Sequence, residues 1–406
     1  MSILELLRLP DYRRVWLLGG IANAMRWLEI LAGTLWVFQQ TGSALAVSAV
    51  VMMRALPMLL LGAMAGALAE RFDRRLVLAG LQATSAVSAG LVVLLAVTGL
   101  LQPWHLMAQG LIAGLSWSGE MATRRRMAAD LAPPGEIVRA IAFDTLTGSC
   151  TRALGPLLGG ALFQWTGLAF AVAIACFFHL VALALVLRIR PPPRPEGPVP
   201  PLSFAGIAEA AAFARREPRL RLVLALTLVM NIFAFAYGAV LPAFGAVAFG
   251  VSGAAIGLLA AAEPFGALLG GLWLTLRPGR APGPVSFVLG SGSFLVLLLL
   301  VAQASSYWLA LALLSLGGLG TARFSALQTA IAMAAAPPAM RSRVLGLVTT
   351  CIGCSPLGVL AMGALADGLG PRLGMVVMAG AGLLVLAGFL AWERLRARGG
   401  QKGFTL

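Results

Sequence analysis

Ionisable side chains stand inside long apolar stretches of this sequence, where a charge is costly. Asn23, Arg26 and Glu29 recur every three residues, so on a helix they lie within one arc. Glu263 lies in another apolar stretch and is followed by Pro264. A carboxyl group removed from water can keep its proton near neutral pH, and an arginine without a carboxylate partner attracts anions. These residue types predict a site for protons and for an anionic or zwitterionic solute.

We assign a substrate or coupling role to the polar residues deepest in these stretches, because ionisable groups at that depth mark ion or solute pathways by default. They are Asn23, Arg26, Glu29, Arg54, Asp144, Arg152, Asn231, Glu263 and Arg323. Two alternatives stay open, an Arg26–Glu29 ion pair that only supports burial and a permanent Arg54–Glu263 pair. We interpret His179 as packed or peripheral, with a role in coupling as the alternative.

Twelve apolar segments must position these residues. Of the 406 residues, 60% are hydrophobic and 11% are charged, against about 25% charged in soluble domains. Each segment has roughly the 20 residues that an α-helix needs to cross the hydrocarbon core, and none alternates like a barrel strand. The expected spans are 12–36, 44–69, 76–98, 105–127, 140–163, 168–188, 219–245, 252–276, 283–302, 306–334, 344–366 and 371–392. The sequence predicts an all-α integral membrane protein.

Arginines set the orientation of these spans. All 30 basic residues except Lys402 are arginine, and they gather in alternate connections, among them the run Arg124, Arg125 and Arg126. The other connections (QQTGS, LLQPW, QWTG, FGVSG and AQASS) carry no charge, and only Asp367 and Arg372 break the pattern. The positive-inside rule then places both termini in the cytoplasm. It also explains the net charge of +15 without nucleic-acid binding.

The two halves of the chain look like copies of each other. Asn23 and Asn231 are displaced by 208 residues, and Arg54 and Glu263 by 209. Such a shift indicates parallel six-helix repeats with a site between them. The segment PPPRPEGPVPP cannot span a membrane, and the residues after it are expected to form an amphipathic helix at the membrane surface. The predicted parts are a six-helix bundle at 1–188, a cytoplasmic linker at 189–218 and a six-helix bundle with a basic tail at 219–406.

Two motifs carry a family resemblance. The connection GALAERFDRR, from Gly66 to Arg75, resembles the signature of the major facilitator superfamily, with Glu70 at a usual Asp and Asp73 at a usual Gly. GTLWVFQQTGS before it and RSRVLGLVTTCIGCSPLGVLAMGALADGLGPR near the eleventh span resemble the drug and siderophore exporter branch, which includes the enterobactin exporter and macrolide efflux proteins. GSCTRALGPLLGG in the fifth span is similar to the antiporter motif of exporters. The resemblance covers essentially the whole chain and implies two six-helix bundles that alternate access.

The motif residues have a physical reading beside the resemblance. The gating-loop residues are Gly66, Glu70, Arg71, Asp73, Arg74 and Arg75, and the fifth-span residues are Gly148, Gly155, Pro156, Gly159 and Gly160. Loop acids favour helix amino ends and loop arginines favour acids or helix carboxyl ends, so contacts made in one conformation would bias alternating access. The alternative is that the arginines enforce topology alone. Close helix packing and a kink at Pro156 would explain the fifth-span residues.

Together these features predict a secondary transporter rather than an enzyme. We expect proton-coupled export, by antiport across a bacterial inner membrane, of a small amphipathic compound such as a drug or siderophore. An importer or a lysophospholipid flippase of the same fold is the alternative, and the repeat disfavours a membrane enzyme or receptor. The chain has no GxxxxGK[ST] loop, so the proton gradient, and no cofactor or metal, would supply the energy. Expected partners are the solute and the bilayer, with the protein a monomer that binds no nucleic acid.

Overall fold

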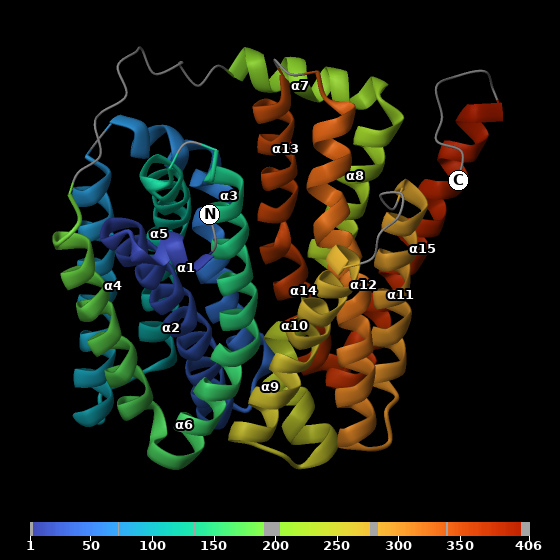
Figure 1. The fold of residues 1–406 in the computed structure, drawn as a ribbon. Helices are drawn as coiled ribbons and strands as arrows, with labels where there is room; N and C mark the ends of the chain where they lie inside the picture. Colours follow the sequence, from blue (N-terminus) through green and yellow to red (C-terminus); the bar gives the residue numbers. More distant parts are fainter. Residues whose placement is uncertain are drawn as a thin grey trace. The chain divides into compact units, whose positions relative to one another are not determined.

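The structure is helical throughout the residues that it describes. This computed structural model describes residues 3–71, 73–133, 135–190, 204–276, 283–337 and 340–398, and in those ranges it contains no strand (Figure 1). The helices of the amino-terminal half are α1 (Ile3–Arg8), α2 (Pro10–Thr41), α3 (Ala44–Arg71), α4 (Arg74–Val97), α5 (Pro103–Leu131) and α6 (Ile137–Leu187).

The carboxyl-terminal half continues in the same way. Its elements are α7 (Phe204–Arg216), α8 (Pro218–Val229), the π-helix η1 (Met230–Ala234), α9 (Tyr237–Phe249), α10 (Gly253–Leu276), α11 (Pro284–Ala302), α12 (Tyr307–Ala335), α13 (Arg341–Gly353), α14 (Ser355–Leu369) and α15 (Pro371–Arg398). Each of the twelve expected spans falls on helix, apart from a residue or two at its ends and interior turns at 235–236 and at Cys354. The predicted all-α membrane fold is confirmed.

One helical element holds two expected spans. By length and hydropathy, nine helical stretches among the described residues can cross a membrane, and one of them, Arg139–Leu187, has 49 residues. A straight helix of that length would measure ~74 Å, more than twice the thickness of the hydrocarbon core. Gly167 interrupts it with φ 77° and ψ 177°, a conformation open to glycine and not to other residues. Figure 1 shows the chain reversing within α6, so the predicted connection QWTG is a tight turn.

The chain packs into two compact units. The first contains Met1–Gly42, Met53–Pro201 and Ser252–Ala261, and the second contains Ser43–Met52, Leu202–Val251 and Ala262–Leu406. The first turns of α3 therefore pack with the second unit, and the first turns of α10 pack with the first unit.

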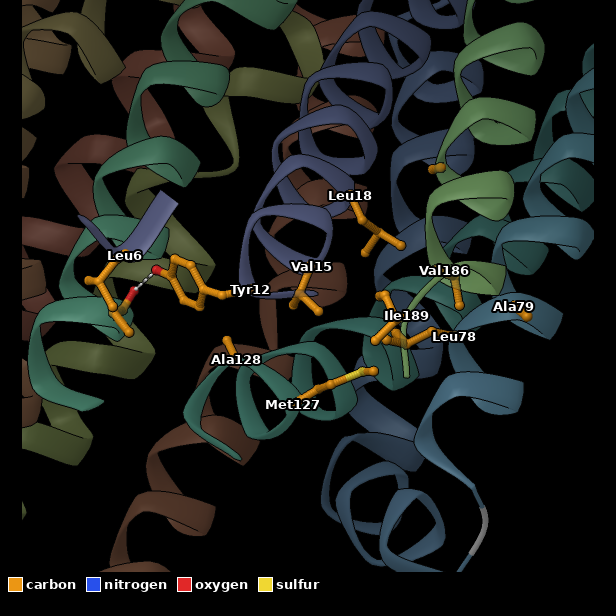
Figure 2. Close-up of a cluster of buried hydrophobic side chains, with 12 residues drawn as sticks. Leu6, Tyr12, Val15, Leu18, Leu78, Ala79, Met127, Ala128, Val186 and Ile189 are labelled. Atoms are coloured by element: carbon orange, nitrogen blue, oxygen red, sulfur yellow. Dashed lines mark hydrogen bonds between the residues drawn. The ribbon is translucent and has the colours of Figure 1, made fainter. Parts of the chain in front are cut away.

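A hydrophobic cluster joins helix ends within the first unit. Figure 2 shows side chains of α2, α4 and α5 meeting near the start of α2, including Val15, Leu78 and Met127, each fully buried. The hydroxyl of Tyr12 donates to the backbone oxygen of Ala140 across 3.2 Å. Because the cluster fixes these helix ends, it sets the rotation and register of the polar residues farther along the same helices.

In the second unit, small residues bring two helices into close contact. A Cβ built on Gly290 of α11 would lie 2.8 Å from the backbone oxygen of Gly320 on α12, so neither position has room for a side chain. The helix expected after the proline-rich segment is α7, whose Ala210 and Ala214 are buried. The carboxylate of Glu209 on α7 pairs with Arg343 of α13 at 2.7 Å. Residues 191–203 of the expected linker lie outside the described part of the chain.

Candidate functional site

Glu29 and Arg54 form a buried ion pair inside the first unit. Oε2 of Glu29 on α2 accepts a hydrogen bond from Nη2 of Arg54 on α3 across 2.9 Å, and both side chains are less than 10% exposed. The same oxygen faces Nε2 of Gln109 on α5 at 3.3 Å, and Nη1 of Arg54 donates to the backbone oxygen of Arg26 across 3.2 Å. The Arg26–Glu29 pair left open by the sequence is therefore not the one formed, since Glu29 pairs with Arg54.

Arg26 pairs instead with an acid that the sequence analysis overlooked. Nη2 of Arg26 lies 3.5 Å from Oε2 of Glu120 on α5, and Nη1 donates to Oδ1 of Asn23. The guanidinium also stacks on Trp117, 4.7 Å from the ring centroid. Asn23 and Arg26 do lie on one arc of α2, as their spacing predicted.

The network continues through Arg124, which we had assigned to a charged connection. That assignment was wrong, because α5 extends to Leu131 and Arg124 is buried in it. Nε of Arg124 lies 3.0 Å from Oε1 of Glu120, and its Nη1 pairs with Asp144 of α6. The cluster thus contains three arginines and three carboxylates. Each of these arginines therefore faces an acid.

His179 belongs to the same cluster, which the interpretation as a packed or peripheral residue did not anticipate. The ring, 5% exposed, places Nε2 3.5 Å from Oε1 of Glu29. Nδ1 lies 3.0 Å from Oε1 of Gln82 on α4. A cavity of about 20 Å³, the space of one water molecule, adjoins these groups. Its polar lining residues are Arg26, Glu29, Arg54, Gln82, Ser85, Ser116, Glu120 and His179.

Two further predicted arginines stack on tryptophans. The guanidinium carbon of Arg152 on α6 lies 5.9 Å from the ring centroid of Trp27 in the first unit. In the second unit, that of Arg323 on α12 lies 5.6 Å from the ring centroid of Trp273. A cation beside an aromatic face is a surface that suits an amphipathic solute.

Glu263 is the most deeply buried predicted carboxyl group, at 1% exposed. Its Oε1 contacts Oγ1 of Thr321, and that hydroxyl also lies 3.1 Å from the backbone oxygen of Gly318. The Thr321 hydroxyl can donate its proton to a Glu263 carboxylate. Alternatively, it can donate to Gly318 and accept a proton from a Glu263 carboxylic acid. The site therefore offers a hydrogen bond to either protonation state of the acid.

Asn231 lies in a π-helical turn that breaks the seventh expected span. The amide of Phe235 donates to the backbone oxygen of Met230 across 2.8 Å, which closes the wider turn of η1. Nδ2 of Asn231 donates to the backbone oxygen of Thr227 across 2.9 Å. Single π-turns inside α-helices often mark functional positions. Nothing in the hydropathy of the span revealed this turn, because one extra residue leaves the apolar pattern unchanged.

The gating-loop residues with described side chains contact their own unit. Asp73 caps α4 by accepting from the amide of Arg75 across 2.9 Å. Arg74 pairs with Asp130 near the end of α5, and Arg75 donates to the backbone oxygen of Leu187 at the carboxyl end of α6. An acid and a helix carboxyl end are the partners expected for loop arginines. The side chains of Gly66, Glu70 and Arg71 lie outside the described residues.

The fifth-span glycines are contact points of α6. A Cβ on Gly155 would lie 2.5 Å from Cβ of Trp27, and one on Gly159 would lie 2.6 Å from the backbone oxygen of Leu28, so α6 packs closely on α2. Gly148 faces the side chain of Asn23. On another face of α6, Gly160 abuts the backbone of Gly253, and the carbonyl of Pro156 abuts Gly257.

Two helix amino ends are capped by side chains from distant helices. Asp367 of α14 accepts from the amide of Ala44 and from the hydroxyl of Ser43, each across 2.6 Å, at the start of α3. Gln164 of α6 accepts from the amide of Ala254, across 2.8 Å, at the start of α10. Ala44 and Ala254 are 210 positions apart, and the capping residues Gln164 and Asp367 are 203 positions apart. The two contacts therefore follow the repeat of the sequence.

Of the cluster residues missed in the sequence, one left a readable signal. Glu120 precedes Arg124 by four residues, the spacing of a helical ion pair. Gln82 and Gln109 are uncharged and gave no such signal. Thr321 looked like an ordinary small residue of an apolar span, so its contact with Glu263 was not foreseeable.

Comparisons with known proteins agree with the fold. The family described as transmembrane secretion effector, a group within the MFS or major facilitator transporters, matches residues 1–402. Over 143 residues the chain is 31% identical to the uncharacterised MFS-type transporter YfiS of Bacillus subtilis strain 168. That match covers 35% of this chain and 33% of YfiS, so it spans about a third of each.

Solved transporter structures share the whole architecture at low identity. A bacterial homologue of the human lysosomal transporter Spinster, inward-facing and occupied, is 16% identical with a TM-score of 0.73, covering 93% of this chain and 96% of that one. The nucleoside transporter NupG is 14% identical with a TM-score of 0.71, covering 94% and 98%. A POT family transporter in complex with 5-aminolevulinic acid is 10% identical with a TM-score of 0.74, covering 94% and 95%. At these identities the likeness concerns the fold alone.

Proposed function

The chain belongs to the transmembrane secretion effector family of major facilitator transporters, and from that premise we propose that it exports a small amphipathic compound in exchange for protons. Membership makes the chain a multi-pass membrane transporter rather than an enzyme. Export, the proton as coupling ion and the class of solute are the parts that we add.

The contact between Glu263 and Thr321 carries the proton proposal. A carboxylate at this depth costs ~2.5–3.5 kcal/mol on insertion scales, and the protonated acid avoids that cost. Thr321 offers a partner to both forms, since its hydroxyl can donate to a carboxylate or accept from a carboxylic acid. A group that is satisfied in two protonation states can bind a proton on one side of the membrane and release it on the other.

The direction and the solute have separate supports. The name of the family and the fifth-span motif GSCTRALGPLLGG, similar to exporters, favour outward transport. Arg152 on Trp27 and Arg323 on Trp273 pair a cation with an apolar face, which suits a solute with an acidic group and a hydrophobic body. We therefore assign the solute contacts to these two arginines.

Several finer assignments belong to the same proposal. We place the protein in the bacterial inner membrane as a monomer, with both termini and the linker at 189–218 in the cytoplasm between bundles at 1–188 and 219–406. We also assign a gating role to the loop from Gly66 to Arg75. Glu70→Gln tests that role, because it should reduce transport and shift the inside–outside accessibility while leaving expression intact. Wild-type transport with unchanged accessibility would mean that the loop residues only determine membrane topology.

The test of the proposed function begins with a search for the solute. Purified protein is screened for thermal stabilisation by matched anionic, zwitterionic and cationic amphiphiles, since a bound ligand raises apparent stability. The best ligand is then offered to inside-out vesicles with an acidic interior, with and without a protonophore. We expect accumulation that the protonophore abolishes. Loss of solute from the vesicles would indicate an importer, and movement of a fluorescent lysophospholipid between leaflets would indicate a flippase.

A further inference from the structure

We propose that His179 and Glu29, oriented by Gln82, form a proton-binding site in the first unit, separate from Glu263. This inference rests on the proposed proton coupling and adds a second titrating position to it. The three residues come from α6, α2 and α4, and all three side chains are less than 10% exposed. The buried ring therefore exchanges protons through the cluster rather than directly with bulk water.

The hydrogen bonds of Glu29 leave one oxygen for the ring. Oε2 faces two donors, Arg54 at 2.9 Å and Gln109 at 3.3 Å. Oε1 is buried and, among the described residues, has no partner within ordinary hydrogen-bond geometry. It faces Nε2 of His179 at 3.5 Å. A buried carboxylate oxygen calls for a donor, and a ring that carries a proton on Nε2 supplies one.

Gln82 lets the ring exist in two forms. The amide oxygen of Gln82 lies 3.0 Å from Nδ1 of His179, so in the structure as it stands Nδ1 is the donor. A neutral ring protonated on Nδ1 would turn a lone pair toward Oε1 of Glu29, which is unfavourable. A ring protonated on both nitrogens satisfies both neighbours. If Gln82 rotates its amide, Nδ1 can accept instead, and a neutral ring protonated on Nε2 still donates to Glu29.

The surrounding charges make the change in protonation consequential. Every packed element contributes to the field around the ring. The groups are Arg26 and Glu29 on α2, Arg54 on α3, Gln82 on α4, Gln109 and Glu120 on α5, and Cys176 on α6, which interacts with Glu29. Two arginines and two glutamates balance there while the ring is neutral. Protonation adds one positive charge, which shares the carboxylate of Glu29 with Arg54 and repels its guanidinium, so proton binding weakens the ion pair between α2 and α3.

The test observes the ring directly. The chain contains two histidines, so full-length protein with 15N-labelled histidine, in nanodiscs, gives two ring systems, and His105→Gln leaves that of His179 alone. We expect this ring to change protonation between pH 5 and 8. Glu29→Gln should move the midpoint by about one pH unit or more, because an adjacent opposite charge acts with that magnitude. In the matched control, His105→Gln, the ring of His179 should keep the midpoint that it has in the wild-type protein.

A His179 ring that keeps one tautomer from pH 5 to 8, or whose midpoint ignores Glu29→Gln, overturns the proposal. Proton-driven transport is measured separately in proteoliposomes. If the ring does not titrate while transport remains proton-driven, this site fails and the proposed function survives. If the ring titrates as expected while transport ignores the gradient, the proposed function fails and the site survives. His179→Gln adds a readout that a purely structural role would not give, since it should remove the part of the pH profile centred on the midpoint of the ring.

Discussion

Buried ions in the first unit are held by one another. Glu29, Arg54, Arg26, Glu120, Arg124 and Asp144 form a continuous chain of charge-assisted contacts across α2, α3, α5 and α6. A buried pair gives little net stability compared with apolar residues, but removing one partner leaves an uncompensated charge. Stability should therefore depend on the members being present together.

Arg54→Met should strongly destabilise the protein, because it leaves Glu29 without its charged partner. We expect a loss of about 3–5 kcal/mol in the free energy of unfolding, measured by denaturant unfolding in detergent. The matched control is Arg343→Met, which breaks the exposed pair with Glu209 and should cost at most about 1 kcal/mol. Adding Glu29→Gln to Arg54→Met should restore part of the loss. Equal effects of the two arginine substitutions would show that the buried pair does not stabilise the fold.

Glu263→Gln should separate solute binding from proton coupling. Glutamine keeps the shape of the acid and mimics its protonated form, so we expect solute binding to survive with a weaker pH dependence. Gradient-driven accumulation should fall by about tenfold or more, the scale on which loss of a proton-transfer group acts. Glu209→Gln, on the exposed surface of α7, is the control and should transport like the wild type. An unaltered pH profile, or a protein that fails to fold, would remove Glu263 as the proton carrier.

At the scale of single residues, the sequence indicated which charges are buried but not which of them form ion pairs. Burial of Glu29, Arg54 and Glu263 followed from their apolar surroundings. The choice of Arg54 over Arg26 as the partner of Glu29 depends on how α2 and α3 are rotated against each other, and single-helix spacing carries no information about that rotation. The contact of His179 with Glu29 was missed for the same reason, since Glu29 lies on another helix.

Among the elements, the amino ends of α3 and α10 each depend on a distant side chain. Asp367 caps α3 and Gln164 caps α10, so the start of each helix is tied to a helix far away in the sequence. Asp367 had seemed to break the pattern of uncharged connections. Its position is explained by the amides at the start of α3, where a negative charge is favourable. Arg372, the other exception, donates to the backbone oxygens of Ala302 and Ala304 across 2.9 and 2.8 Å.

Asp367→Ala should loosen the first turn of α3. Loss of a capping side chain costs about 0.5–2 kcal/mol, so hydrogen exchange of the amides in 44–47 should accelerate by roughly 2- to 30-fold, if exchange follows local opening. Asp367→Asn keeps an acceptor and loses the charge, so it should have a smaller effect. Gln164→Ala is the matched variant for α10 and should accelerate exchange there while leaving α3 unchanged. Unaltered exchange at 44–47 in Asp367→Ala would mean that the cap contributes no stability.

Helix existence was predictable in this chain, and irregularities within helices were not. The hydropathy of about 20 residues identifies a helix wherever the chain must cross hydrocarbon, so the twelve expected spans coincide with helical segments. The π-turn at Met230–Ala234 and the break between α13 and α14 at Cys354 leave that hydropathy unchanged. They depend on local backbone hydrogen bonding and on neighbours such as Gly358, which packs against the backbone of Ile232.

The whole molecule is built from a duplicated pattern whose two copies have diverged in charge. At the position displaced by 209 residues, one copy has Arg54 and the other has Glu263. In the first unit the arginine is matched by Glu29, whereas in the second the acid contacts Thr321. The divergence gives one unit an ion pair at this position and the other a buried carboxyl group in contact with a hydroxyl.

Topology is the property of the whole chain that the arginine pattern predicts most directly. With both termini cytoplasmic, a cysteine at Arg215 on α7 should react with a membrane-impermeant maleimide only when the cytoplasmic face is exposed. A cysteine at Gln40, near the opposite end of α2, should react from outside in intact cells. Both variants are made in a background with Cys150, Cys176, Cys351 and Cys354 replaced by serine or alanine. The two cysteine variants control for the intrinsic reactivity of each thiol with maleimide, because each position should be labelled from one side of the membrane and protected from the other. Labelling of position 215 in intact cells would place α7 outside and reverse the assigned orientation, since every span from the amino terminus onward would then run the other way.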